Sequence, residues 1–554
     1  MNLLPSRPRP PRALFRRSSA RAESAPPPVR RETADVVAGW LGVPPVRSDE
    51  AARKRLGATQ RTGAAAAVVL AGLTCGQPIP LPVVVVGGLV AMVVVVGSWL
   101  ILGTVAHAVP LRRLRTIAVW WSLPLALGRP LFSGDLWSYQ AQGLIPLAGH
   151  DPYRLGPARA LEADSAVAQH VSHYWVDTPA PYGPAWEGLA TLVGRATGTN
   201  LVAGVLVYRT LALAGVLLIA WALPRLVRRT GTSQSTALWL CLLNPLVLWH
   251  LVSGAHNDAI MLGLMFAGFE LGLGGLARRG TNGVPRLAGG FALLILSANV
   301  KVVAIGAVCC LAAYAARRHG RVVLVTAVAA GGGVVLSTVV ALGSGLGFGW
   351  IGALGSSTSV YSWMAPTNQL GFLIGGGAGL FGWHVLPQAV HVATLLGAAV
   401  GAVLCGRVLR SVCRGAVEPV RGLALLLTIM VVCGPVVQPW YLLWAILPLA
   451  VSARLPQQRN RLVIFSAVIA LALPPTGSGA PTLITGYAIA AAVGAGVWWR
   501  LRAAQLARAE RAEPCTGATT GEVDRVHDVA TSQVTPVPKR THHSWSHVVT
   551  GYDV

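Results

Sequence analysis

Residues 132–139 (FSGDLWSY) bring acidic, aromatic and hydroxyl side chains together within one short segment. Asp135 and Tyr139 are four residues apart, so a helical turn would place both on one face. An N-cap or an interfacial anchor is the structural alternative for Asp135. Further on, residues 149–154 (GHDPYR) add histidine and carboxylate groups, and 181–184 (PYGP) is more typical of turns than of chemistry. We therefore treat this stretch as a candidate catalytic segment.

Three further polar groups interrupt apolar sequence later in the chain. They are residues 256–258 (HND), Lys301 and residues 438–441 (QPWY). Each alone is compatible with a structural role as a helix cap, a snorkelling lysine or part of an aromatic belt. Together they supply acid, base, cation, amide and aromatic groups, and ionisable residues inside a membrane protein are by default candidates for function.

These residue types suit the transfer of a sugar from a phosphate. A glycosidase generally needs two carboxyl groups, because its alcohol leaving group must be protonated. A sugar phosphate leaves as an anion, so one carboxylate can suffice as the general base for the acceptor hydroxyl. Asp135 suits that role, and Lys301 with His256 could stabilise the departing phosphate. Tryptophan and tyrosine side chains offer flat apolar faces for pyranose rings.

The candidate substrate- and donor-binding residues share a polar or aromatic side chain and a place in these groups. They are Tyr139, His150, Asp151, Tyr153, Tyr182, His256, Asn257, Asp258, Lys301, Gln438, Trp440 and Tyr441. Asp151 is the alternative general base. The cysteines have no zinc spacing, and no metal ligand is predicted. No cofactor is expected, and a divalent cation is possible but not expected to be required.

The rest of the sequence must hold these groups at a membrane. Of its 554 residues, 53% are hydrophobic and 12% are charged, whereas a soluble domain has roughly 25% charged residues. A run of about 20 apolar residues spans a bilayer as a helix, and we predict an all-α polytopic membrane protein with about 13–14 transmembrane helices. The apolar runs cover residues 63–77, 81–106, 116–128, 201–223, 237–251, 258–276, 287–299, 302–315, 322–342, 386–404, 424–437, 442–451, 463–473 and 483–499. Residues 371–383 are predicted to be re-entrant or interfacial.

The positive charge predicts how the chain is oriented. The net charge is +25, and arginines crowd the two tails and alternate short loops. That distribution follows the positive-inside rule, and it lacks the basic stripe with interleaved aromatics that would indicate nucleic-acid binding. We predict a disordered cytoplasmic arm at 1–61, a catalytic transmembrane domain at 62–504 with a long outer loop at 131–200, and a disordered cytoplasmic tail at 505–554. The polar groups then meet at the extracytoplasmic face of the plasma membrane.

The spacing of these groups resembles a known family. Residues 132–139, 149–153 and 182–184, followed by Asn244-Pro245 and the three later polar groups, are similar to the actinobacterial polyprenyl-phosphomannose-dependent α-1,6-mannosyltransferases of the MptA/MptB type. The resemblance covers about residues 63–499. It implies a GT-C glycosyltransferase whose first outer loop holds the catalytic Asp135.

The same resemblance implies the substrates. The donor would be a polyprenyl phosphomannose, and the acceptor would be a lipid-anchored mannan of the phosphatidylinositol-mannoside or lipomannan type. A β-linked donor would give an α-linked product by inversion. Within enzymes, the alternatives are transfer of another polyprenyl-linked sugar such as arabinofuranose, or an earlier mannosylation step. Outside enzymes, they are a transporter or flippase of lipid-linked sugar, which predicts ionisable groups near the bilayer midplane and repeated halves, and a non-catalytic partner of such an enzyme.

Overall fold

Long apolar runs with few charges give this chain helices along almost all of the length that can be described. The computed structural model describes residues 49–75, 79–278, 280–356, 361–472 and 488. Within these residues every regular element is a helix and none is a strand. The prediction of an all-α polytopic membrane protein is confirmed.

Seven helical stretches in the described part of the chain are long and apolar enough to cross a membrane. The number rises to eight if one bent pair is counted, and two further apolar helices are shorter. Several of the predicted 13–14 spans therefore correspond to helices that are too short to cross a membrane as one straight segment. The seven stretches contain α3 (Leu81–Gly103), α8 (Leu201–Thr230), α10 (Asp258–Leu276), α11 (Val284–Val300), α12 (Ile305–His319), α13 (Val322–Gly343) and α16 (Leu386–Arg414).

The bent pair consists of α9 (Gln234–Leu242) and the π-helix η5 (Val247–Ser253), which meet at 61°. Pro245 lies at the break, where its missing N–H cannot continue the helical ladder. The Asn244 side chain accepts from Leu246 N–H at 3.0 Å and donates to Ser466 Oγ at 2.9 Å. The break is thus fixed by hydrogen bonds, and it sets the direction of the π-helix.

The first helix begins earlier than the sequence pattern predicts. The predicted arm was to end at residue 61, but α2 (Asp49–Cys75) already begins at Asp49. Residues 1–48 of that arm, and the predicted tail at 505–554, lie outside the described residues, as does the predicted span at 483–499 apart from residue 488. The added part of this helix already contacts α4 (Leu111–Leu127), because the Trp121 indole N–H donates to the Gln60 carbonyl at 3.1 Å.

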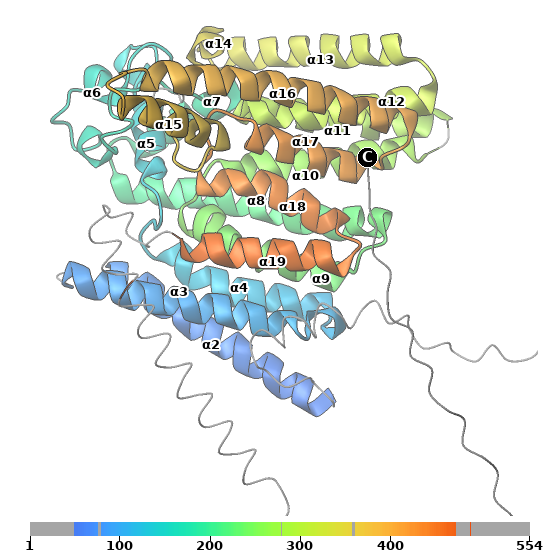
Figure 1. The fold of residues 1–554 in the computed structure, drawn as a ribbon, viewed down its shortest axis with the longest axis horizontal. Coiled ribbons are helices and arrows are strands. Elements are labelled where there is room, and N and C mark those ends of the chain that lie inside the picture. The colour runs from blue at the N-terminus through green and yellow to red at the C-terminus, as the bar shows by residue number, and fades with distance from the viewer. Residues whose placement is uncertain (1–48, 76–78, 279, 357–360, 473–487, 489–554) are drawn as a thin grey trace, which may run out of the picture. The chain divides into compact units, whose positions relative to one another are not determined.

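The segment predicted to be re-entrant or interfacial is mostly helix. It overlaps α15 (Pro366–Gly379), which lies against the start of α16 (Figure 1). Side-chain atoms at Gly371 and Gly375 would collide with Val390 and Leu386, so these glycines permit the close approach. The remaining later elements are α14 (Gly349–Ala353), α17 (Pro419–Val432), η9 (Pro439–Tyr441), α18 (Leu442–Ser452) and α19 (Pro456–Leu471).

The predicted outer loop folds into short helices at one end of the long ones (Figure 1). Two of these helices are α5 (Asp135–Leu144) and α7 (Pro184–Thr197), and Gly143 and Gly194 allow their backbones to touch. A side chain at Gly143 would meet the Ala190 carbonyl. The short helices are α5 (Asp135–Leu144), η3 (Pro146–Ala148), α6 (Pro157–Ala160), η4 (Ala168–His170) and α7 (Pro184–Thr197).

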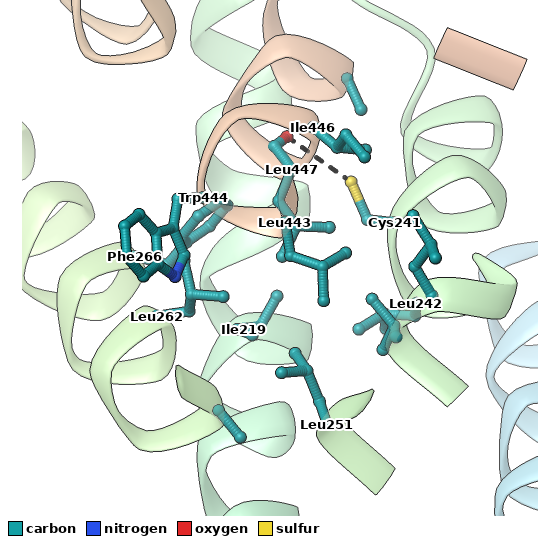
Figure 2. Close-up of a cluster of buried hydrophobic side chains, with 14 of the residues drawn as sticks. Ile219, Cys241, Leu242, Leu251, Leu262, Phe266, Leu443, Trp444, Ile446 and Leu447 are labelled. Atoms are coloured by element: carbon teal, nitrogen blue, oxygen red, sulfur yellow. Dashed lines mark hydrogen bonds between the residues drawn. The ribbon is translucent and has the colours of Figure 1, made fainter. Parts of the chain in front are cut away.

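Beneath this end, a buried apolar core joins α8, α9, α10 and α18 (Figure 2). Ile219, Leu443 and Phe266 are all at most 1% exposed. The Cys241 thiol lies 3.7 Å from the Leu447 carbonyl oxygen. Trp444 belongs to this core, and its indole also reaches the polar residues described next, so core packing fixes part of the site.

Candidate active site

Asp135 stands at the first position of α5, where the turn before the helix is tightly held. Its backbone N–H donates to Ser133 Oγ at 3.1 Å, and a carboxylate in the first helical turn is favoured by the helix dipole. Phe132 has φ 68°, a left-handed conformation that a bulky residue rarely adopts. Its ring stacks on Trp249 of the π-helix at 5.1 Å. Strained backbone of this kind collects at functional sites.

His256 lies directly behind Asp135. The distance between His256 Nδ1 and Asp135 Oδ2 is 3.4 Å, and the imidazole is fully buried. The ring is stacked on Trp440, with centroids 3.9 Å apart. The backbone N–H of His256 donates to the His250 carbonyl at 3.1 Å, and Ala255 just before it has φ 49°. The end of the π-helix therefore determines where this imidazole meets the carboxylate.

Lys301 forms a buried ion pair with Asp258. Lys301 Nζ is 2.8 Å from Asp258 Oδ2, and the Trp444 indole N–H donates to Asp258 Oδ1 at 2.5 Å. The ammonium also lies over the rings of Tyr441 and Tyr182, at 4.6 and 5.5 Å from the centroids. One cation is thus held by a carboxylate and aromatic faces, an arrangement that offsets the cost of burying its charge.

Tyr139 supports the site from behind and does not line it. It is fully buried, with its ring 4.9 Å from Trp186 and 5.6 Å from Tyr182. Its hydroxyl oxygen lies 3.4 Å from the backbone N–H of Asn257, which links α5 to the 256–258 turn. Burial raises the pKa of both Tyr139 and Tyr182, so both remain neutral hydroxyls.

Asp135 opens into a pocket between α5, the loop before α7 and the loop before α18. One wall is a face of α5, the second comes from residues 175–182, and the third comes from residues 436–441. Among the described residues that line it, Asp135 is the only charged one. The lining residues are Asp135, Ser138, Gln142, Trp175, Thr178, Pro179, Pro181, Tyr182, Val436, Gln438, Trp440 and Tyr441.

Eight of the predicted site residues do not line this pocket. Five of them are joined to it through the contacts given above, and they are Tyr139, His256, Asn257, Asp258 and Lys301. The other three lie apart from it. His150 is exposed. Asp151 accepts from the Tyr153 N–H at 2.8 Å and is 3.4 Å from the Arg154 guanidinium, so its carboxylate shapes a turn. Tyr153 is buried in a separate apolar cluster with Ala180 and residues 346–353. The structure therefore places Asp135, and not Asp151, at the pocket wall.

The sequence reasoning missed several residues that the structure brings to the site. Ser138 and Gln142 line the pocket, and a signal for them exists, since they follow Asp135 at helical spacings of three and seven. Trp444 follows the 438–441 group by one helical turn. Trp175 has no such signal, because it comes from an irregular loop whose path only the tertiary structure defines.

Close to the site, α7 carries a carboxyl group that does not line the pocket. Glu187 is fully buried, neither of its oxygens has a hydrogen-bond partner within the described residues, and α7 is not among the membrane-length helices. Burial raises the pKa of Glu187 to about 8. A neutral carboxyl group is therefore stable in this environment at neutral pH.

We expect Glu187→Gln to stabilise the protein at alkaline pH. In the wild type the unfolded chain ionises this group from about pH 4.3 upward, while the folded chain does so only near pH 8. Wild-type stability should therefore fall as pH rises through this window, and the glutamine variant should not share that loss. Thermal unfolding midpoints compared near pH 5 and near pH 8.5 test this. If the difference in unfolding midpoint between the two proteins is the same at both pH values, the prediction is contradicted.

Comparisons with known proteins agree with the sequence resemblance. A family model described as alpha-(1→6)-mannopyranosyltransferase, N-terminal domain, matches residues 54–317, and a model described as the MptB C-terminal domain matches residues 367–503. No solved structure matches the chain.

Three relatives cover most of the chain. A probable alpha-(1→6)-mannopyranosyltransferase of Mycolicibacterium smegmatis is 35% identical, over 65% of this chain and 68% of the relative. An alpha-(1→6)-mannopyranosyltransferase of Mycobacterium tuberculosis is 34% identical, over 65% and 68%. Alpha-(1→6)-mannopyranosyltransferase B of Corynebacterium glutamicum is 32% identical, over 72% and 70%. This chain belongs to the alpha-(1→6)-mannopyranosyltransferase family of membrane-embedded glycosyltransferases.

Proposed function

We propose that this glycosyltransferase moves mannose from polyprenyl phosphomannose to a lipid-anchored α-1,6-mannan, with inversion at the anomeric carbon, on the extracytoplasmic face. The observation that carries the proposal is a single carboxylate, Asp135, at the wall of an aromatic pocket. The names of the relatives support the sugar and the linkage.

One carboxylate is enough for this reaction. The acceptor 6-hydroxyl attacks C1 of the mannose, the C1–O bond to the phosphate breaks, and the phosphate leaves with the electron pair as an anion. Asp135 accepts the hydroxyl proton as the new C1–O bond forms. The leaving group needs no proton, in contrast to the alcohol that a glycosidase expels. The His256 imidazole, whose Nδ1 is 3.4 Å from the carboxylate, is the group next to this base.

A lipid-linked donor fits the surroundings of Lys301. Ala298 and Ile305 flank Lys301 in sequence and line an open apolar groove between α11, α12, α13 and α16, with a volume of ≈ 860 Å³. A polyprenyl chain could lie in this groove with its phosphate beside the Lys301 end. The charge of a phosphate would be favoured there, because the Lys301 ammonium lies against the pocket aromatics Tyr182 and Tyr441.

The positive-inside rule supports the outer face. The segment 131–200 carries few arginines, whereas Arg317, Arg318 and Arg321 lie at the far end of α12 from Lys301. Cytoplasmic ends of membrane helices retain such residues. Nucleotide-linked sugars are cytoplasmic, so a site on the opposite face would need a donor carried in the membrane.

Transfer of radiolabelled mannose tests the proposal. We expect membranes containing the protein to transfer mannose from synthetic polyprenyl phosphomannose to a short α-1,6-mannoside, and to make no product from a nucleotide-linked mannose. Spheroplasts, which present only the outer face, should use the same added acceptor. A donor with a shortened prenyl chain should show a raised KM if the apolar groove holds the chain.

Each result is decisive about one part of the proposal. Product from polyprenyl phosphoarabinose alone would replace mannose as the sugar. Product in inverted vesicles but not in spheroplasts would place the site on the cytoplasmic face. Binding of the lipid donor with correct insertion and no transfer to any mannoside would contradict the transferase assignment in favour of transport.

A further inference from the structure

One face of α5 presents three polar side chains to the same pocket. Asp135, Ser138 and Gln142 are spaced by three and four residues, and residues at such spacing lie on one side of a helix. All three line the pocket. From Asp135 to Gln142 the helix rises about 10 Å, at about 1.5 Å per residue. The three polar groups therefore follow one another along one wall, beginning at the carboxylate.

Ser138 and Gln142 are buried without partners. Ser138 is 4% exposed and Gln142 is 3% exposed, and neither Ser138 Oγ nor Gln142 Oε1 has a hydrogen-bond partner among the described residues. Other helical hydroxyls in this chain donate to the carbonyl one turn back, as Thr191 and Thr394 do at 2.8 and 2.7 Å. Buried polar groups are normally paired, so a sugar hydroxyl that reached these two atoms would supply a hydrogen bond that the described residues leave unmet.

The opposite walls supply aromatic and neutral groups. Trp175, Tyr182, Trp440 and Tyr441 present ring surfaces, and Gln438 adds a second amide. Hydroxyl and amide groups both donate and accept, as sugar hydroxyls do. No cation lines the pocket within the described residues, and the Asp135 carboxylate would repel a phosphate. The pocket therefore suits a neutral, hydroxyl-rich ring better than the phosphate end of a donor.

We propose that Ser138 and Gln142 bind the terminal sugar of the acceptor and aim its 6-hydroxyl at Asp135. This inference rests on the proposed function, because it names the acceptor subsite of the same site. The ligand class is a mannoside with a free 6-hydroxyl. The subsite extends from Asp135 along α5 toward Trp175, and the donor phosphate lies on the Lys301 side.

The test compares Ser138→Ala and Gln142→Leu with Gln169→Leu, a matched control that removes an exposed glutamine amide of the same outer segment. We expect each pocket variant to raise the KM for a short α-1,6-mannoside about tenfold, the size of one lost hydrogen bond to a buried partner. The KM for the donor and its slow hydrolysis without acceptor should stay as in the wild type. Deoxy acceptors should identify the contact, since the analogue that lacks the bound hydroxyl should be equally poor with wild type and Gln142→Leu.

A binding measurement separates this inference from the proposed function. Ligand-observed NMR detects whether a methyl α-1,6-mannobioside binds to the purified wild type. Binding that Gln142→Leu weakens would support the subsite even if no donor gave product. Wild-type transfer with an unchanged acceptor KM in both folded pocket variants would overturn the subsite and leave the transferase standing. A raised donor KM in place of a raised acceptor KM would overturn it as well.

Discussion

Asp135→Asn is expected to insert and fold as the wild type does and to lose mannosyl transfer by about 10²- to 10⁴-fold, the usual contribution of a general base. Asparagine keeps the volume of the side chain and can still hydrogen-bond near His256, but its amide cannot take the acceptor proton. The loss of a carboxylate from the first turn of α5 should cost no more than about 1 kcal/mol of stability. Initial rates at saturating donor and acceptor, with expression and unfolding temperature in parallel, measure this.

Two matched variants make the result specific. Asp164→Asn removes an exposed carboxylate of the same outer segment and should leave transfer unchanged. Asp151→Asn should lower activity only slightly, because that carboxylate holds a turn beside Tyr153. Wild-type turnover by Asp135→Asn would end the general-base hypothesis. Loss of transfer in Asp151→Asn with retention in Asp135→Asn would assign the base to Asp151.

Much of the helical architecture could be predicted from the apolar runs. The run at 258–276 has the same bounds as α10, and the run at 322–342 differs from α13 by one residue. The first run begins at Asp258 and the second directly after Arg321. Almost every residue within them is apolar, so the length of each apolar run is close to the length of its helix. The positions of such elements follow from hydrophobicity alone.

The number of spans could not be predicted in the same way. An apolar run shows that a segment is buried or lipid-facing, but it does not show whether the helix continues straight. The run at 237–251 contains Asn244-Pro245 and bends by 61° into a π-helix. α17 has 14 residues and α18 has 11, and both are buried against other helices. Tertiary packing, which is absent from a hydropathy pattern, makes these short helices possible.

The polar groups show the same division between what sequence can and cannot predict. The distribution of arginines predicts that the four groups share one face, and the structure joins them by contacts of Asp135 with His256, His256 with Trp440, and Lys301 with Asp258. The partner of each side chain could not be predicted. Which charge neutralises Lys301 depends on how α10 packs beside α11, and helix register is a tertiary property.

The Lys301–Asp258 pair leads to the second large prediction. Asp258 is fully buried and Lys301 is nearly so, and Trp444 donates to the same carboxylate. Removal of one partner leaves an uncompensated buried charge, so Lys301→Met and Asp258→Asn should each destabilise the protein by about 3–5 kcal/mol. The double variant should lose much less than the sum of the two single variants, because it leaves no unpaired charge. Unfolding in detergent micelles at neutral pH measures all three.

The exposed pair Lys54–Glu50 on α2 is the matched control, with a similar N–O distance of 2.7 Å. Lys54→Met should cost at most about 1 kcal/mol, as solvated pairs generally do. Equal losses at both pairs would contradict the role of burial. The folded Lys301→Met/Asp258→Asn variant then separates structure from chemistry. If its donor KM or turnover is impaired, the ammonium also acts on the departing phosphate. If both are as in the wild type, Lys301 serves only to neutralise Asp258, and the phosphate must be stabilised by other groups.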